Sequence, residues 1–377
     1  MIEADGGQVA EAVVLVGGQG ERLRPLTLST PKPLLPMAGA PFLVHLLARL
    51  RAAGIERVVL ATGYRAACFG PSVTGAVPGL SVECIEEPVP LGTGGALRHA
   101  VTRLGSERVL VHNGDSLSGA DIRALVGAHD RRRADLTICL TDVADVRPYG
   151  AVQTDAAGWV TDFREKGAAR WRPPGDPATS GQARRPTPGR INAGCYVVRR
   201  SLLDAVPAGE TVSLERRILP DLLLSGARVL GHPDPGYFRD IGTVTEYIQA
   251  CRDLVLRRAP TPLPHDGRDG VLRLGTSIVE AGASMGNGTT VGPGCHIGPD
   301  VRLDASVLMS GVHVGAGTTV VRSVLGAGSV IEWGAEIVDS VVADGAHVGA
   351  GARLAAGARI WPGAAVARAG VVTGRVT

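Results

Sequence analysis

A glycine-rich segment near the beginning of the chain combines a flexible backbone with two cationic side chains. An apolar run is followed by Gly17, Gly18 and Gly20, and then by Arg22 and Lys32. Glycines let backbone N–H groups approach phosphate oxygens closely, because no Cβ atom stands in the way. Two cations beside such a turn suit a triphosphate from which pyrophosphate leaves. The segment therefore predicts a site that binds a nucleoside triphosphate.

The same glycines could instead belong to a dinucleotide-binding turn. That fingerprint needs Gly-x-Gly-x-x-Gly leading directly into a helix. Here the sixth position is Leu23, and Pro25 stops any long helix. Either cation alone would more often be a solvated surface charge, so the prediction depends on the glycines and the cations together.

An aspartate marks the end of a later apolar run. Asp115 follows the run 109–111, which we expect to form a strand. Open α/β sheets bind ligands at the carboxyl ends of their strands. A single aspartate would more often cap a helix or form a turn. Asp115 is nevertheless placed where a ligand is expected.

The first two thirds of the chain have the pattern of an α/β domain. Short apolar runs alternate there with amphipathic segments, as parallel strands linked by crossover helices do. The clearest runs are 12–16, 58–61, 109–111 and 136–140, and the clearest helical segment is 42–53. We therefore predict an α/β sandwich.

Two stretches lack hydrophobic periodicity. Residues 167–190 are rich in Ala, Arg, Pro, Gly and Ser, which predicts a long loop. Residues 257–265 are rich in Arg and Pro and indicate a linker. The predicted organisation is a first domain of residues 1–258, a linker of residues 259–272 and a second domain of residues 273–377.

A six-residue repeat distinguishes the second domain. Aliphatic residues or Met recur every six positions, commonly followed by a small or acidic residue, with occasional five-residue slips. An α-helix has a different period, whereas a triangular prism of short parallel strands fits, with aliphatics inside and small residues at the corners. At about eighteen residues per turn, residues 279–365 predict about five coils. The recurring positions are Val279, Met285, Val291, Ile297, Leu303, Leu325, Ile331, Ile337, Val342, Val348, Leu354 and Ile360. Such repeats resemble the left-handed β-helix family.

Charge and composition exclude several classes of protein. The 39 Lys and Arg against 36 Asp and Glu give a net charge of +3, too small and too evenly spread for a nucleic-acid surface. The six cysteines form no Cys-x-x-Cys pair that would indicate zinc. No apolar stretch approaches the roughly 20 residues of a membrane span, and the N-terminus does not look like a leader. We expect a cytoplasmic protein whose partner is a small molecule.

Several motifs occur together in one order. Residues 15–34 read Leu-Val-Gly-Gly-Gln-Gly-Glu-Arg-Leu-Arg-Pro-Leu and end in Thr-Pro-Lys-Pro-Leu, and the later motifs are at 86–96, 113–115, 163–166, 191–194 and 239–243. Together they resemble the sugar-1-phosphate nucleotidyltransferases, most closely those that guanylylate heptose-1-phosphate and mannose-1-phosphate. Glu21 stands where the family commonly has Thr, and the 167–190 loop is longer than usual. The resemblance implies a Rossmann-like nucleotidyltransferase domain with a mixed, mostly parallel sheet, followed by a left-handed parallel β-helix.

The resemblance also implies a reaction. A sugar-1-phosphate or cyclitol phosphate attacks the α-phosphorus of an NTP, which yields an NDP-sugar and pyrophosphate. The attacking phosphate is already ionised at neutral pH, so catalysis consists of positioning and charge neutralisation. Arg22 and Lys32 would be catalytic, and Asp115 and Asp240 would also be catalytic by holding Mg²⁺.

The family further assigns residues to each substrate. Nucleotide contacts would come from Leu15, Gly17, Gly18, Gly20, Glu87, Gly92 and Thr93. Sugar-phosphate contacts would come from Gly150, Glu165, Lys166 and Asn192. Lys166 would contact the phosphate, and Glu165 and Asn192 would bind sugar hydroxyls. Heptose, mannose, glucose or a carbocyclic mimic could all fit, so the acceptor stays open.

The nucleotide base is predicted from one acidic residue. Glu87 occupies a position where relatives that use thymidine, uridine or adenine nucleotides tend to carry Gln. Guanine presents two adjacent donors, N1–H and N2–H, which a carboxylate can accept together. GTP is therefore the favoured nucleotide, and adenylyl, thymidylyl or uridylyl transfer is the alternative.

The sequence also allows two other functions and predicts one kind of assembly. The β-helix could be an acyltransferase that uses His296, His313 or His347 as a base, although no long loop projects beside any of them. The first domain could be a degenerate nucleotide-binding regulator, but its predicted catalytic residues are intact. The strand faces and final coil of the β-helix need covering, which predicts a homo-oligomer, a dimer or a tetramer.

Overall fold

The computed structural model describes residues 9–165 and 186–377. The chain forms two compact units, of which the first comprises Met1–Gly17 and Arg49–Phe238 and the second Gly18–Ala48 and Arg239–Thr377. Lys166 and most of the predicted loop 167–190 lie outside the described residues. The end of that loop is corrected, because a strand already begins at Gly189.

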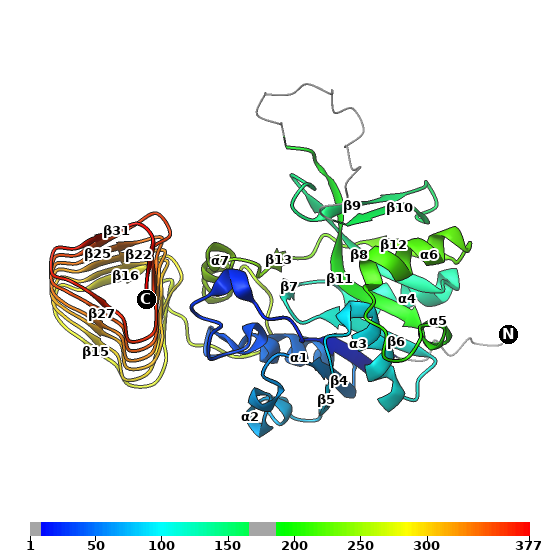
Figure 1. Cartoon of the computed structure of the whole chain (residues 1–377), viewed down its shortest axis with the longest axis horizontal. Helices are drawn as coiled ribbons and strands as arrows, with labels where there is room; N and C mark the ends of the chain where they lie inside the picture. The colour runs from blue at the N-terminus through cyan, green and yellow to red at the C-terminus, as the bar shows by residue number, and fades with distance from the viewer. Residues whose placement is uncertain (1–8, 166–185) are drawn as a thin grey trace. The chain divides into compact units, whose positions relative to one another are not determined.

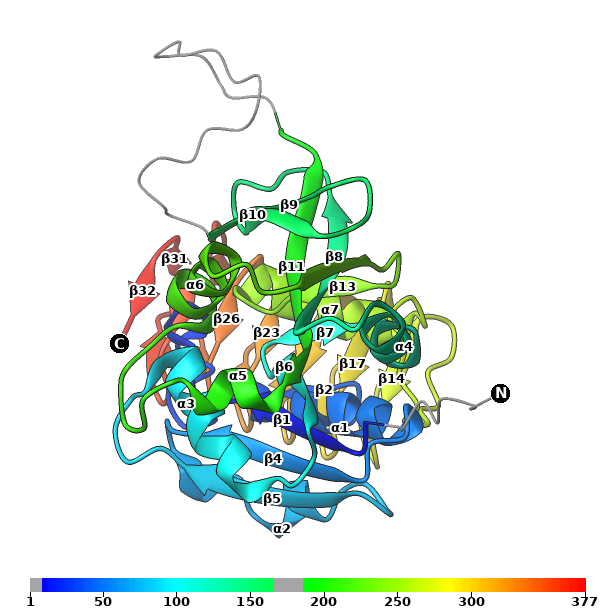
Figure 2. The same ribbon diagram turned by 90° about the vertical axis from the view of Figure 1, so that its right-hand side faces the viewer.

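A seven-stranded sheet forms the core of the first unit (Figure 2). Its order is β12-β8-β11-β6-β1-β4-β5, and only β11 runs antiparallel to its neighbours. This confirms the predicted mixed, mostly parallel sheet. Val13 and Val14 of β1 are fully buried, as expected for a central strand covered on both faces. The strands are β1 Glu11–Leu15, β4 Arg57–Thr62, β5 Ser81–Glu86, β6 Arg108–Asn113, β8 Leu136–Val143, β11 Gly189–Arg199 and β12 Val229–Pro233.

Helices and an antiparallel hairpin complete the catalytic fold. The hairpin pairs β9 Gly150–Thr154 with β10 Val160–Glu165. The α-helices of the chain are α1 Phe42–Ala52, α2 Pro71–Thr74, α3 Gly92–Ala100, α4 Ile122–Arg132, α5 Arg200–Asp204, α6 Leu219–Leu224 and α7 Val244–Val255. Short turns of helix are η1 Glu21–Leu23, η2 Lys32–Leu34, η3 Ala66–Cys68, η4 Val101–Arg103 and η5 Leu214–Ile218, and the remaining short strands are β2 Pro36–Met37, β3 Ala40–Pro41, β7 Ser116–Ser118 and β13 Phe238–Asp240. Within the described ranges, no helix is both long and apolar enough to cross a membrane.

One buried histidine should make the stability of the first unit depend on pH. His129 of α4 is 3% exposed, and its Nδ1 lies 2.9 Å from Thr137 Oγ1. Burial lowers the pKa of His129 from 6.5 to about 4, so between pH 7 and pH 5 only the unfolded chain takes up this proton. The free energy of unfolding should fall by about 2 kcal/mol over this interval because of His129. Denaturant titrations at both pH values should show a smaller fall for His129→Asn, and equal falls would contradict this account.

The second unit packs α7 against the segment that follows the glycine turn. Thr243 caps α7, because its hydroxyl accepts a hydrogen bond from the Glu246 N–H at 3.2 Å. Tyr247 of α7 is fully buried, and its hydroxyl donates to the carbonyl of Pro36. These contacts fix the helix that begins four residues after Asp240.

Three parallel sheets form the rest of the second unit (Figure 1). One sheet contains β14 Val271–Arg273, β17 Thr289–Val291, β20 Val307–Leu308, β23 Val324–Leu325, β26 Val341–Val342, β29 Arg359–Ile360 and β32 Arg375–Val376. The next contains β15 Ile278–Val279, β18 His296–Ile297, β21 His313–Val314, β24 Val330–Ile331, β27 His347–Val348 and β30 Ala365–Val366. The third contains β16 Ser284–Gly286, β19 Arg302–Asp304, β22 Thr319–Val321, β25 Glu336–Val338, β28 Arg353–Leu354 and β31 Val371–Val372. This stack confirms the predicted parallel β-helix, and its hexapeptide repeat is typical of the left-handed form.

The β-helix is longer than its repeat predicted. Its sheets have seven, six and six strands. Residues 279–365 span β15 to β30, which is about five coils as predicted, and β14, β31 and β32 extend the β-helix beyond that span. The repeat search also missed Leu308, Val314 and Val320, which are buried in the interior. A shortened corner causes the five-residue slips. There Ser306, Ser323 and Ser340 stack in the interior, and the Ser323 and Ser340 N–H groups donate to the preceding serine hydroxyl at 3.2 and 3.1 Å.

Candidate active site

Glu87, the residue predicted to contact the nucleotide base, lies against the first glycine of the turn. A Cβ atom on Gly17 would come within 2.8 Å of Glu87 Oε1, so only glycine fits here without displacing that carboxylate. Glu87 Oε2 accepts a hydrogen bond from the Leu91 N–H at 2.8 Å. Burial raises the pKa of Glu87, and the hydrogen bond from Leu91 opposes this shift. The structure thus places an oriented acceptor beside Gly17.

Leu15 and Asp115 lie at the carboxyl edge of the sheet. Leu15 ends β1 and pairs with Asn113, the last residue of β6. Gly114 follows, and its N–H donates to the Leu15 carbonyl at 2.8 Å. Asp115 therefore begins the connection to β7, at the strand end where the sequence predicted it. The Asn113 Oδ1 atom is buried and has no hydrogen-bond partner among the described residues.

Three of the predicted catalytic side chains meet in the second unit. Lys32 Nζ lies 3.9 Å from Asp240 Oδ1, and the Lys32 side chain is only 9% exposed. A Cβ atom on Gly242 would come within 2.9 Å of Arg22 Nη2 and 3.0 Å of Asp240 Oδ2. Arg22 and Asp240 thus flank the same glycine. Two cations from residues 22–32 and one carboxylate from residue 240 therefore form one cluster.

The backbone beside this cluster makes a tight turn at Gly20. Gly20 has a φ of +64°, and the Thr27 hydroxyl donates to its carbonyl at 2.8 Å. A Cβ atom there would press to 3.1 Å against the Cβ of Lys32, so the glycine permits the close turn. The one-turn helices η1 and η2 that follow are too short to add a strong helix dipole here. The positive charge here comes from Arg22 and Lys32.

The predicted sugar residues come from the hairpin and from β11. Glu165 ends β10 directly opposite Gly150 of β9. Gly150 has a φ of +98°, and a Cβ atom there would collide with the Arg164 carbonyl, so this register requires glycine. Asn192 lies on β11, and its side chain contacts Tyr196 and Gly194. Gly150 and Glu165 are thus brought together.

The second glycine turn begins a helix and is held by a distant segment. Gly92 has a φ of +68° and starts α3, while the N–H groups of Gly94 and Gly95 donate to the Val212 carbonyl at 2.9 and 3.2 Å. The Thr93 hydroxyl donates to Glu215 Oε2 at 2.6 Å. The Thr93 side chain is therefore engaged inside the protein, which the sequence did not indicate.

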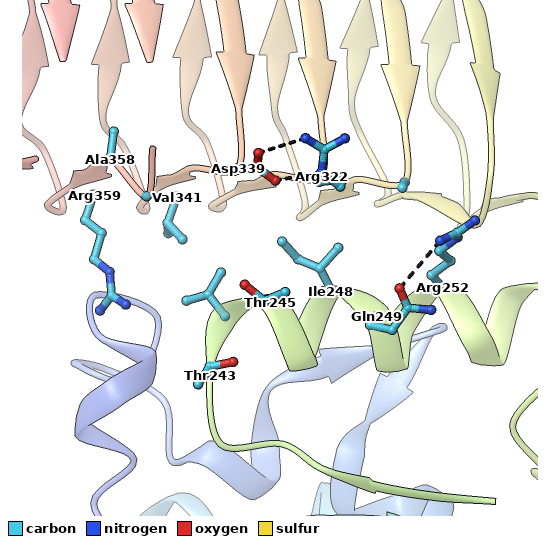
Figure 3. A pocket seen from close by; sticks show the side chains of 13 residues that line it. Thr243, Thr245, Ile248, Gln249, Arg252, Arg322, Asp339, Val341, Ala358 and Arg359 are labelled. Carbon is cyan, nitrogen blue, oxygen red and sulfur yellow. Dashed lines mark hydrogen bonds and ion pairs between the residues drawn. The ribbon is translucent and has the colours of Figure 1, made fainter. Parts of the chain in front are cut away.

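Two cavities in the second unit lie outside this set of residues. A cavity of about 210 Å³ is bordered by α7 and by the Arg322–Asp339 ion pair of the β-helix (Figure 3). A cavity of about 440 Å³ is bordered by residues of the 25–41 segment and by β-helix strands. Neither is lined by a predicted site residue. Among the described residues, no three His, Cys, Asp or Glu side chains cluster as a ready metal site.

Comparison with known proteins identifies the fold and the reaction. The family model for nucleotidyl transferases matches residues 11–256, and the model described as the GMPPB C-terminal domain matches residues 270–373. The chain belongs to the nucleotidyl transferase family. It is 44% identical to mannose-1-phosphate guanylyltransferase of Mycobacterium tuberculosis, over 80% of each chain. These findings confirm the prediction of a sugar-1-phosphate nucleotidyltransferase.

Two further relatives match the catalytic part of this family member. D-glycero-α-D-manno-heptose 1-phosphate guanylyltransferase of Aneurinibacillus thermoaerophilus is 32% identical, over 65% of this chain and 98% of its own length. A crystal structure of HddC from Yersinia pseudotuberculosis complexed with GMP-PN superposes with a TM-score of 0.55 at 29% identity. It covers 65% of this chain and 99% of its own.

The histidines of the rival acyltransferase hypothesis lie on one sheet of the β-helix. His296 and His313 are opposite each other on β18 and β21, with ring centroids 4.7 Å apart. His296 Nε2 lies 2.5 Å from Glu280 Oε1, and His347 Nε2 lies 3.1 Å from Glu332 Oε1. All these side chains are at least one third exposed where they pair. These side chains form a row on the exposed surface of one sheet.

Proposed function

We propose that this nucleotidyltransferase is a magnesium-dependent guanylyltransferase that makes a GDP-sugar and pyrophosphate from GTP and a sugar-1-phosphate. The observation that carries the proposal is the cluster of Arg22, Lys32 and Asp240 around Gly242. Its two cations suit the phosphates of a bound nucleotide. GTP is a cytoplasmic metabolite, so we expect the enzyme to act in the cytoplasm.

The chain's own residues account for the charge changes of the reaction. Pyrophosphate leaves as negative charge develops on the β- and γ-phosphates, and Arg22 and Lys32 neutralise that charge. Lys32 is held beside Asp240 and is nearly buried, so it needs little reorganisation during the reaction. The backbone at Gly17, Gly18 and Gly20 binds the phosphates. The sugar phosphate attacks as an anion, so we assign no general base.

The available oxygen donors fit a hard divalent cation. Asp115 and Asp240 would hold Mg²⁺, and the unpartnered amide oxygen of Asn113 offers a further ligand of the kind that Mg²⁺ accepts. The ion would supply charge neutralisation for the reacting phosphates. Lys32 would then help to hold the Asp240 carboxylate in place.

Glu87 supports guanine as the base. One of its oxygens is tied to the Leu91 N–H, which fixes the plane of the carboxylate beside Gly17. A fixed carboxylate accepts from the N1–H and N2–H groups of guanine and has no donor for the adenine edge. The guanylyltransferase relatives agree with this choice.

Mannose-1-phosphate is the first candidate acceptor. The mannose-1-phosphate enzyme matches across 80% of this chain, whereas the heptose-1-phosphate enzyme matches across 65%. Glu165 and Asn192 would bind sugar hydroxyls, Lys166 would bind the phosphate, and Gly150 would let the backbone of β9 lie close to Glu165. A pyrophosphate-release screen crosses GTP, ATP, UTP, CTP and dTTP with hexose, heptose and cyclitol phosphates. GTP with mannose-1-phosphate should give the highest kcat/KM, and a higher value for dTTP or ATP on the same acceptor would refute the guanylyl assignment.

The β-helix is proposed to join copies of the chain into a dimer or tetramer. Large apolar side chains are exposed on it, including Ile278 at 62%, Trp333 at 58% and Val371 at 75%. Burial of such residues stabilises an interface, and it also covers open strand edges. Light scattering of the purified protein should give at least twice the mass of one chain, which is 38.8 kDa. A monomer at micromolar concentration would rule out this assembly.

A further inference from the structure

A hydrogen-bonded carboxylate lies between the nucleotide turn and the sugar-binding strand. Glu215, in η5, is half-buried, and its two oxygens accept from different elements. Oε2 accepts from the hydroxyls of Thr93 at 2.6 Å and Ser213 at 3.0 Å. Oε1 accepts from the hydroxyl of Tyr196 at 3.3 Å. One side chain thus binds both α3 and β11.

From Tyr196 the network continues to the proposed sugar-binding amide. The Asn192 Nδ2 group donates to the Tyr196 hydroxyl at 2.5 Å, and Asn192 Oδ1 accepts from the Gly194 N–H at 2.9 Å. The Gly194 N–H can donate only to the amide oxygen of Asn192, so the positions of the amide oxygen and nitrogen are determined. Burial and the Glu215 carboxylate raise the pKa of Tyr196 well above 10, which keeps its hydroxyl protonated as the donor to Glu215. Glu215 therefore fixes how Asn192 points.

From Thr93 the network continues to the proposed base-reading residue. The Leu214 N–H donates to the Thr93 hydroxyl at 2.8 Å, so this hydroxyl bridges η5 and α3. The Val212 N–H donates to the Leu91 carbonyl at 2.9 Å, and the Leu91 N–H holds Glu87. The segment that carries Glu215 therefore also supports the orientation of Glu87.

We infer that Glu215 is a positioning residue that couples the nucleotide site to the sugar-phosphate site. The inference rests on the proposed function, because it takes Glu87 and Asn192 as the two substrate contacts. A carboxylate is needed, because it can accept from three hydroxyls at once. A glutamine would have to present an N–H group to one of these donors. Order imposed at one site then favours binding at the other, and such coupling is reciprocal.

The test is a set of matched variants assayed with GTP and mannose-1-phosphate. Glu215→Gln should raise the KM values of both substrates by about tenfold. Tyr196→Phe removes only a hydroxyl and should raise the KM of the sugar phosphate alone. Thr93→Val should raise the KM of GTP alone, and Thr93→Ser, which keeps the hydroxyl, should restore it. Thermal melting of each variant shows whether it is folded.

A double-mutant cycle separates positioning from general stability. If Glu215 acts through Asn192, Glu215→Gln should add less than twofold to the KM of the sugar phosphate in an Asn192→Ala background. Full additivity, or unchanged KM values in folded Tyr196→Phe and Glu215→Gln, would overturn the inference while leaving the proposed function intact. A wild-type protein without turnover for any nucleotide and sugar phosphate would remove the proposed function, and the inference with it.

Discussion

Replacing Asp115 by alanine is expected to lower kcat by about a thousandfold or more, because the charge of the reacting phosphates is then poorly neutralised. Asp115 lies in the connection after β6, outside the packed core of the sheet, so the domain should still fold. Pyrophosphate release under saturating GTP and sugar phosphate gives kcat directly. Raising the MgCl₂ concentration should recover little of the loss, because the variant lacks one of the proposed metal ligands and does more than bind Mg²⁺ weakly.

A matched variant distinguishes this effect from a general loss of negative charge. Asp142 is also at the carboxyl end of a strand, β8, but its side chain is 76% exposed. Asp142→Ala should keep kcat within about threefold of wild type, as exposed substitutions usually do. Near-wild-type activity in a folded Asp115→Ala protein would show that the metal assignment is wrong.

Replacing Glu87 by glutamine is expected to reduce the preference for GTP by about a hundredfold or more. The Glu87 carboxylate would accept two hydrogen bonds, from N1–H and N2–H of guanine. In the glutamine variant, the amide NH₂ group would face one of these donors and could not accept from it. Glutamine is the replacement to test because its side-chain oxygen can still accept from the Leu91 N–H, so the turn is retained. The ratios of kcat/KM for GTP, ATP and dTTP with one acceptor measure the change.

The same residue should give the reaction a pH dependence. Burial raises the pKa of Glu87, so its carboxylate is protonated at a higher pH than an exposed glutamate would be. Since only the ionised form accepts both guanine donors, kcat/KM for GTP should fall as pH falls towards that pKa. Glu87→Gln should lose this acidic limb, and the exposed neighbour Glu86 provides the control as Glu86→Gln. An unchanged GTP preference in Glu87→Gln would contradict the proposed base recognition.

The sequence predicted the parts of the structure that depend on local pattern. Apolar runs such as 12–16 and 58–61 became the buried strands β1 and β4, because strands covered on both faces must be apolar throughout. The hexapeptide repeat predicted the β-helix for a similar reason. The six-residue repeat was not recognised at Leu308 and Val320. The corners at the buried serines are one residue shorter, so they shift the period by one residue.

The motifs singled out residues that lie close together in the structure, whereas contacts that depend on packing were missed. Arg22, Lys32 and Asp240 were expected to act together, and they meet around Gly242. Tyr196 and Glu215 were missed, because nothing in the sequence around them is distinctive. Tyr196 contacts Asn192 and Glu215 contacts Tyr196, and the pairing of β11 with β8 is irregular between residues 192 and 196. Such a bulge redirects side chains, and alternation of polar and apolar residues does not reveal it.

A competition assay tests the central claim most directly. The purified chain is incubated with MgCl₂, mannose-1-phosphate and equal concentrations of GTP, ATP, UTP, CTP and dTTP, and the nucleotide sugars are separated and identified by mass spectrometry. The account predicts GDP-mannose as the dominant product, formed together with an equal amount of pyrophosphate and abolished by chelation of the metal. Another nucleoside diphosphate sugar as the main product, or no nucleotide sugar at all, would contradict it.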